Sequence, residues 1–176
     1  MANKKNIVRR IKSAVISVSD KSNLKPLLET LNRYNVKLIS SGCTFKAIRK
    51  LGYRCLEVSD YTGFNEILDG RVKTLHPKIH AGILNKRNNN SHKREIKKNN
   101  FQNIDLVIVN FYPFEKTLNT TKNHNKIIEK IDIGGPALVR SAAKNYNDVA
   151  VITSTNQYSA LIDQLDRKST RLNSSH

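Results

Sequence analysis

The strongest indication of a fold in this sequence is the nearly continuous apolar run at residues 105–110. A strand that is apolar on both faces is typical of parallel sheets, in which helices cover each face. Residues 13–19 form a second short run, rich in β-branched side chains. Weaker runs lie at residues 36–39, 55–58 and 149–153. We expect each of these segments to be a strand of one sheet.

Segments with helical spacing follow the runs at residues 13–19 and 36–39. Leucines at positions 24, 27, 28 and 31 share one helix face, and Asn23 is placed to cap that helix. After residue 44, a second helix is expected to turn Phe45, Ile48 and Leu51 inward. The first half of the chain therefore predicts two strand-helix units.

The second half predicts the same pattern. Residues 137–144 are expected to be helical, with Pro136 near the first position, where proline is tolerated. Residues 91–100 are polar and predict a solvated helix or a surface loop, whereas residues 60–81 have no sustained periodicity and predict a long loop or linker. Alternating strands and helices predict an α/β fold, with a mostly parallel sheet and helices on both faces.

A chain of 176 residues that is 38% hydrophobic is long enough for one buried core. We assign residues 1–12 to a basic N-terminal extension, residues 13–165 to the folded domain, and residues 166–176 to a tail typical of a cloning or adaptor scar. The two cysteines are too few for a disulfide framework, and no apolar run could cross a bilayer. We therefore expect a cytoplasmic protein.

The formal net charge of +17 suggests nucleic-acid binding, because Lys and Arg that neutralise phosphates release counterions. However, the cations are spread along the chain among many Asn and Ile residues. Lys, Asn and Ile are the residues that A/T-rich codons supply, so biased genome composition explains the charge. We expect no nucleic-acid partner.

Polar residues follow three of the strands, at the edge where parallel sheets bind ligands. Residues 19–21 (Ser, Asp, Lys) and residues 41–44 (Ser, Gly, Cys, Thr) each lie where a strand ends and a helix begins. Backbone N–H groups, hydroxyls and the helix dipole favour an anion there, and Lys21 adds a charge. Taken alone, Ser and Thr at these positions could equally be helix caps.

Further polar and aromatic clusters occupy residues 69–77, 110–114 and 131–136. The glycines of the last cluster allow close approach of a ligand and expose N–H groups at a helix start. Lys144 and Arg140 end the following helix, where cations also pair favourably with the helix C-terminus. The residues alone do not decide whether these two cations belong to a ligand site or only pair with the helix C-terminus.

Taken together and in order, six segments resemble the N-terminal domain of the bifunctional AICAR transformylase/IMP cyclohydrolase family. They are residues 17–21, 58–64, 70–77, 112–114, 131–135 and 142–145. The resemblance covers residues 13–153 and implies a methylglyoxal-synthase-like α/β domain. It also implies a cyclic amidine hydrolase that closes 5-formamido-imidazole-4-carboxamide ribotide to inosine monophosphate with loss of water. No cofactor and no metal are implied.

The resemblance further implies two groups of site residues. Those expected around the phosphate and ribose are Ser19, Asp20, Lys21, Ser41, Gly42, Cys43, Thr44, Arg71, Val72 and Thr74. Those expected around the base are Lys73, Tyr112, Asp132 and Lys144, with Val109, Asn110, Ile133 and Gly134.

The implied reaction needs groups of these kinds. Asp132 or a lysine can take the proton that the attacking carboxamide nitrogen loses, and a cationic lysine and the N–H groups of residues 133–134 can stabilise the oxyanion. We expect Lys144 to be the main proton donor and acceptor, with Lys73 and Tyr112 orienting and polarising the substrate.

The sequence departs from the family at Cys43, where the family usually has a second glycine. The family protein continues into a folate-using transformylase domain, so we expect this chain to be truncated and to transfer no formyl group. We expect the complete protein to be a homodimer. The alternative is a non-catalytic nucleotide- or phosphate-sensing domain of the same fold, which would lack the base-side residues.

Overall fold

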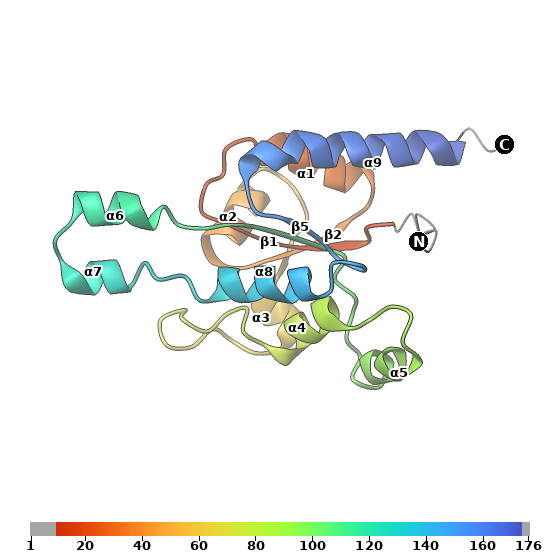
Figure 1. The fold of residues 1–176 in the computed structure, drawn as a ribbon, viewed down its shortest axis with the longest axis horizontal. Helices are drawn as coiled ribbons and strands as arrows, with labels where there is room; N and C mark the ends of the chain where they lie inside the picture. Colours follow the sequence, from red (N-terminus) through yellow and green to blue (C-terminus); the bar gives the residue numbers. More distant parts are fainter. Residues whose placement is uncertain (1–9, 174–176) are drawn as a thin grey trace, which may run out of the picture.

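The computed structural model describes residues 10–173, and the sheet lies at the centre of that part of the chain (Figure 1). Five strands form one parallel sheet in the order β3-β2-β1-β4-β5. They are β1 (Ser13–Val18), β2 (Lys37–Ser40), β3 (Leu56–Glu57), β4 (Leu106–Asn110) and β5 (Ala150–Ile152). In the central register, Val15 lies between Ile39 and Val107. The parallel sheet predicted from the sequence is confirmed.

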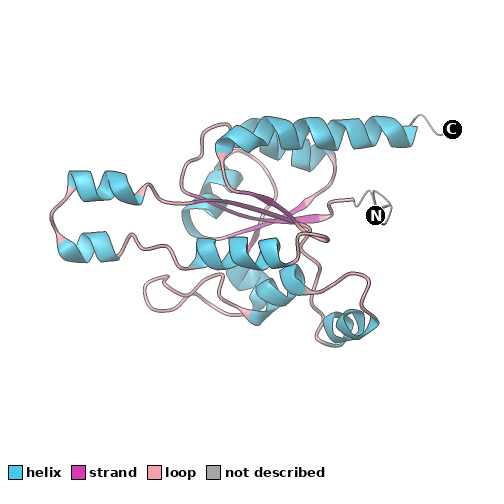
Figure 2. Cartoon of the chain, in the orientation of Figure 1, coloured by secondary structure: helices cyan, strands magenta, loops and turns pink. Residues whose placement is uncertain are grey.

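Helices cover both faces of the sheet, as predicted (Figures 1 and 2). One face is covered by α1 (Leu24–Arg33), α2 (Gly42–Lys50) and α9 (Tyr158–Asn173), the last preceded by the short 3-10 helix η1 (Thr155–Gln157). The other face is covered by α3 (Val58–Thr62), α4 (Pro77–Leu84) and α8 (Gly134–Lys144). The remaining helices are α5 (Asn90–Lys98), α6 (Phe114–Thr120) and α7 (His124–Ile128).

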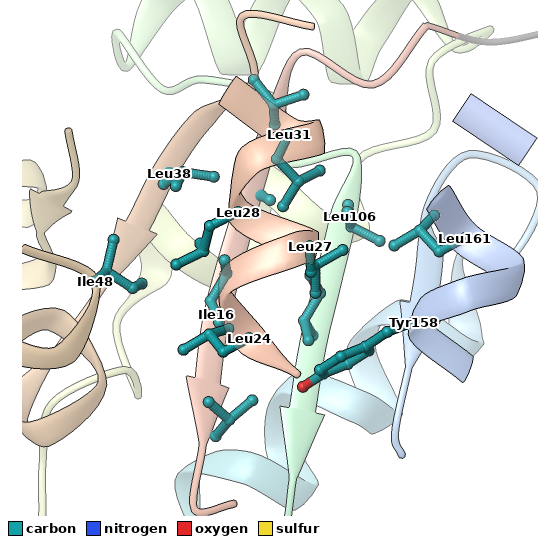
Figure 3. Close-up of a cluster of buried hydrophobic side chains, with 14 of the residues drawn as sticks. Ile16, Leu24, Leu27, Leu28, Leu31, Leu38, Ile48, Leu106, Tyr158 and Leu161 are labelled. Carbon is teal, nitrogen blue, oxygen red and sulfur yellow. The ribbon is translucent and has the colours of Figure 1, made fainter. Parts of the chain in front are cut away.

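The alternation of side chains along the central strands produces two cores. Ile16 of β1 and Leu106 of β4 are fully buried beneath α1, with Leu24 and Leu27 packed over them (Figure 3). Val15, the neighbour of Ile16, points to the opposite core beneath α4 and α8. Each such buried side chain contributes about 1.5–3 kcal/mol, so both faces hold the sheet in place.

Two polar side chains, one buried and one partly buried, join the elements below the sheet. The Asn145 amide donates to the carbonyl oxygens of Ile83 (2.8 Å) and Asn85 (3.0 Å), which ties the end of α8 to the end of α4. The Arg87 guanidinium donates to the carbonyl oxygens of Asn85 (2.6 Å) and Ile104 (2.8 Å). These bonds fix α4 and α8 relative to β4.

Helices α6 and α7 form an arm that leaves the end of β4, projects from the body and returns at the start of α8 (Figure 1). No pattern in the sequence predicts this arm, because its residues carry little apolar periodicity. Phe114 and Leu118 on α6 and Ile128 on α7 are all at least one-third exposed. Residues 129–133 connect the end of α7 to the start of α8 and so return the chain to the sheet edge.

The expectation of a continuous loop at residues 60–81 was wrong at both ends. Helix α3 runs to Thr62, and α4 begins at Pro77, a residue suited to the first position of a helix. The His76 ring nitrogen Nδ1 accepts from the Lys78 N–H (3.1 Å) and so caps α4. A cap formed by histidine is not among the usual sequence signals, and this explains why α4 was missed.

Two local expectations were also wrong. Asn23 lies at the N-cap of α1, but its backbone is left-handed (φ 58°) and its side chain makes no capping bond. Leu51 is 40% exposed and lies just beyond α2, which ends at Lys50. By contrast, the polar segment at residues 91–100 is the solvated helix α5, which buries none of its residues.

The tail assigned to residues 166–176 continues α9 as far as Asn173. The Asp166 carboxylate accepts from the Tyr34 hydroxyl (2.5 Å) and pairs with Arg33 (3.3 Å). The rest of that tail, residues 174–176, and residues 1–9 of the N-terminal extension lie outside the described residues. Within residues 10–173, no helix has the length and apolar character needed to span a membrane.

Candidate functional site

A cleft of about 550 Å³ lies at the carboxyl ends of β1, β2 and β4, where the sequence predicted a ligand site. This volume falls within the range of small-molecule sites, roughly 300–1,000 Å³. The wall comes from loops far apart in the sequence. It includes residues 17–19, 41–44, 69–71, 73–75 and 128–135, with Lys21, Asn110 and Tyr112.

Most of the predicted site residues line this cleft. They are Ser19, Lys21, Ser41, Gly42, Cys43, Thr44, Arg71, Lys73, Thr74, Asn110, Tyr112, Asp132, Ile133 and Gly134. Four others do not line it, namely Asp20, Val72, Val109 and Lys144. The sequence analysis assigned no role to Glu129 and Lys130, which also form part of the wall, because they belong to no recognisable motif.

The loop between β1 and α1 is held by Asn110 at the end of β4. The Asn110 side-chain oxygen accepts from the N–H groups of Ser19 (2.7 Å) and Asp20 (2.8 Å), and its amide donates to the Asp20 carbonyl (2.8 Å). Lys21 folds back over this loop, where its ammonium donates to the Ser19 carbonyl (3.2 Å). Asn110 is therefore a positioning residue for one side of the cleft.

Asp20 contributes to the shape of the same loop rather than to the cleft wall. Its carboxylate accepts from the Ser22 N–H (2.8 Å). Hydrogen bonds from the Ser22 side chain and backbone lower the pKa of Asp20 below its ordinary value. Asp20 therefore stays ionised near neutral pH and closes the turn before α1.

In the loop between β2 and α2, the Thr44 hydroxyl is bonded within the fold, whereas the Ser41 side chain makes no capping bond. The buried Thr44 hydroxyl bonds the N–H and the carbonyl of Val18 in β1. Ser41 occupies the N-cap of α2. The left-handed conformation falls on Gly42 (φ 54°), and Cys43 is not among the described residues with positive φ. The Cys43 side chain is thus tolerated without backbone strain, and its free thiol is exposed.

Lys73 crosses the cleft wall over two glycines. A Cβ added at Gly70 would collide with the Lys73 side chain, and one added at Gly42 would lie 3.2 Å from the Lys73 ammonium. The ammonium therefore reaches the start of α2. It also pairs with the Glu66 carboxylate at 3.0 Å.

Arg71 and Tyr112 meet the returning limb of the arm. The Arg71 guanidinium donates to the Glu129 carboxylate, just beyond the end of α7. The next residue, Lys130, places its ammonium 5.0 Å from the centroid of the Tyr112 ring. These two contacts hold residues 129–130 beside the cleft.

Asp132 lies where the arm joins α8. Its Oδ1 accepts from the Gly135 N–H (2.9 Å), and a Cβ at Gly135 would collide with the same carboxylate. A Cβ at Gly134 would lie 2.7 Å from the Thr74 hydroxyl oxygen. Both glycines are required for this close packing, which leaves a carboxylate and a helix start together in the cleft wall.

Behind this wall, His80 of α4 is half-buried and its Nδ1 lies 2.9 Å from the Ser141 hydroxyl of α8. Burial lowers the pKa of His80, and the Thr74 carbonyl opposes this effect. His80 is therefore neutral near pH 7. No motif in the sequence indicates this residue, which in the structure joins α4 to α8.

Lys144 is placed away from the other base-side candidates. It is the last residue of α8, whereas Gly134 in the cleft wall is the first. Ten residues of helix separate them by about 15 Å along the axis. Lys144 is exposed at that far end, so within one chain it does not join Asp132 and Lys73.

Comparison with known proteins gives the family. The chain belongs to the MGS-like domain family, which matches residues 23–137. It is similar to the bifunctional purine biosynthesis protein PurH of Clostridioides difficile strain 630, with 49% identity over 88% of this chain and 30% of that protein. The PurH of Synechococcus sp. strain CC9605 is 52% identical over 85% of this chain and 29% of its own length.

The chain spans about 30% of the length of these curated relatives. A solved structure, the crystal structure of ForH, superposes with a TM-score of 0.79 at 31% identity, covering 89% of this chain and 79% of that one. The family and the fold predicted from the sequence are confirmed. In the part of the chain that the structure describes, no three His, Cys, Asp or Glu side chains form a group that could hold a metal ion.

Proposed function

We propose that the cleft binds a purine ribotide and closes 5-formamido-imidazole-4-carboxamide ribotide to inosine monophosphate. One observation carries the proposal: Asp132, Lys73 and Tyr112, from three separate segments, line the same cleft as the two anion-binding loops. The names of the relatives, bifunctional purine biosynthesis proteins, support a role in purine biosynthesis. We also propose a cytoplasmic location and a homodimer.

The phosphate would bind beside the starts of α1 and α2. The first N–H groups of a helix have no intrahelical acceptor, and neither helix start is capped by its N-cap side chain. Ser41 and the cationic residues Lys21 and Arg71 line the same cleft. Thr44 contributes by fixing the loop, because its hydroxyl is already bonded to β1.

Ring closure forms one C–N bond and releases one water. The carboxamide nitrogen attacks the formyl carbon and loses one proton, and the formyl oxygen becomes an oxyanion that is protonated to a hydroxyl. Transfer of a second proton from nitrogen to this hydroxyl, with cleavage of the C–O bond, then releases water. We assign proton removal to Asp132, which lines the cleft and has one carboxylate oxygen bonded to the Gly135 N–H. Lys73, a cation, would stabilise the oxyanion.

Tyr112 and the start of α8 complete the base-side wall. Tyr112 is 47% exposed and lines the cleft, with the Lys130 ammonium over its ring. The N–H of Gly134 begins α8, where it has no intrahelical acceptor, and it is a second candidate donor to the oxyanion. Ile133, 56% exposed, offers an apolar surface for the imidazole ring.

The experiment is an ultraviolet assay of ring closure with the formylated ribotide. We expect the wild-type chain to form inosine monophosphate and Asp132→Asn to reduce the rate by roughly 10²–10⁴-fold while nucleotide affinity changes little. Binding of the ribotide without any turnover would overturn the proposed reaction and indicate a non-catalytic nucleotide-binding domain. Circular dichroism of each variant checks that the fold is retained.

A further inference from the structure

The charges of the cleft wall almost cancel, which is unexpected for a site that would bind a phosphate. The wall has four cations, Lys21, Arg71, Lys73 and Lys130, and three carboxylates, Asp69, Glu129 and Asp132. Asp132 has a clear role in its bond to the start of α8. Glu129 instead binds one of the four cations directly.

The bond between Arg71 and Glu129 joins two segments that are 58 positions apart in the sequence. It links the loop before α4 to the end of α7, at the rim of the cleft. The two side chains are 62% and 56% exposed, so water screens the pair and the bond is weak. A weak, exposed pair is easily exchanged for another anion.

The guanidinium group also favours such an exchange. Its planar fork donates to carboxylates and phosphates in the same bidentate geometry. A phosphate in the cleft therefore competes with Glu129 for the same donors on Arg71. Because a phosphate carries more charge than one carboxylate, it can replace Glu129 when it binds nearby.

We propose that Glu129 is an affinity-determining residue whose carboxylate occupies Arg71 in the empty cleft and is displaced by the phosphate of a bound nucleotide. The inference rests on the proposed function, since it concerns the ligand of the same cleft. Displacement of Glu129 weakens nucleotide binding and so favours release of the product. It also frees the end of α7 from the loop before α4 whenever the phosphate is bound.

Calorimetric titration tests this inference with three ligands, namely inosine monophosphate, inosine and inorganic phosphate. Glu129→Gln should strengthen binding of inosine monophosphate and of phosphate by about two- to fivefold, the range that one exposed ion pair supports. Affinity for inosine should not change, because inosine has no group that competes for Arg71.

Glu115→Gln is the matched control. Glu115 is an exposed residue in the first turn of α6, on the same arm, and does not line the cleft. The substitution changes the net charge equally, so it should leave all three affinities close to those of the wild type. In an Arg71→Met background, Glu129→Gln should lose its effect, since the shared donor is gone.

Unchanged or weaker phosphate binding by Glu129→Gln would overturn the inference, as would an equal gain in Glu115→Gln or a gain that persists without Arg71. Failure of the proposed function is seen separately, in the ring-closure assay. A chain that binds nucleotide more tightly after Glu129→Gln but never closes the ring would retain this inference and reject the reaction.

Discussion

The hydroxyl of Thr44, in the first turn of α2, is bonded to both backbone groups of Val18 at the end of β1. It accepts from the Val18 N–H at 3.1 Å and donates to the Val18 carbonyl at 3.0 Å. Both residues are buried, so no solvent can replace these bonds. One side chain thereby ties the start of α2 to the end of the central strand, between the two loops that are proposed to bind the phosphate.

Thr44→Val should therefore destabilise the fold. Valine keeps the shape of threonine but leaves the buried Val18 N–H without the Thr44 acceptor and the Val18 carbonyl with only the Lys21 ammonium as donor (3.4 Å), which costs about 1–3 kcal/mol. Urea unfolding followed by circular dichroism measures the loss in the free energy of unfolding. Thr44→Ser keeps the hydroxyl and should lose less, so an equal loss in both variants would show that the methyl group matters more.

Asn110→Ala should weaken nucleotide binding, although the Asn110 side chain carries no charge that could attract the phosphate. The substitution removes three hydrogen bonds that shape the loop at Ser19 and Asp20. We expect an affinity loss of about 1–3 kcal/mol for inosine monophosphate, the sum of a few ordinary hydrogen bonds. Calorimetry measures it. Unchanged affinity in a folded variant would show that the loop holds its shape without Asn110.

The two cysteines should differ sharply in reactivity. Burial raises the pKa of Cys55 to about 12, so its thiol stays protonated and inert at neutral pH. Cys43 is exposed in the cleft wall. A maleimide at about pH 7 should label Cys43 alone, as read by mass spectrometry, and inosine monophosphate should slow the labelling.

Cys43→Ala provides the control, because this variant should take up no label until it is unfolded.

The raised pKa of Cys55 also makes the stability of the fold depend on pH. The unfolded thiol, with an ordinary pKa of 9.0, loses its proton before the folded one does, so the fold should lose stability as the pH rises from about 9 to about 12. Labelling of Cys55 in the folded chain would contradict the assignment.

The sequence was sufficient for the sheet because the strands carry their own signal. The apolar run at residues 105–110 and the β-branched run at residues 13–19 are strands, as predicted, and the structure pairs them as β4 and β1. Helix α1 was equally clear, since its four leucines repeat at helical spacing and are all buried. These features depend on local pattern and burial, which one sequence records.

The cleft could be predicted only in part. Residues at strand ends were identified because a parallel sheet brings those ends together. The bond between Arg71 and Glu129 was not, because it depends on an arm whose path back to the sheet leaves no periodic pattern. The structural role of Thr44 was likewise hidden, because the same residue type at a helix start caps, binds or, as here, joins the helix to a strand.

Lys144 gives the sharpest remaining test of the proposed reaction. The sequence analysis expects it to transfer protons, yet it lies at the opposite end of α8 from the cleft. Within one chain, about 15 Å of helix separates it from the cleft wall. The expected catalytic role and the structure agree only if a second copy of the chain brings its Lys144 to the cleft, which the proposed homodimer allows.

Lys144→Met keeps the aliphatic stem and removes the charge, so the fold and nucleotide affinity should change little while ring closure slows by roughly 10²–10⁴-fold. Mixing this variant with Asp132→Asn should then restore activity, because a mixed dimer contains one cleft with a wild-type Asp132 and a wild-type Lys144 from its neighbour. Each variant incubated alone is the control. Near-wild-type turnover by Lys144→Met would reduce Lys144 to a helix C-terminal cation, worth well under about 1 kcal/mol. A slow variant that no mixture restores would place its action within one chain and contradict the shared cleft.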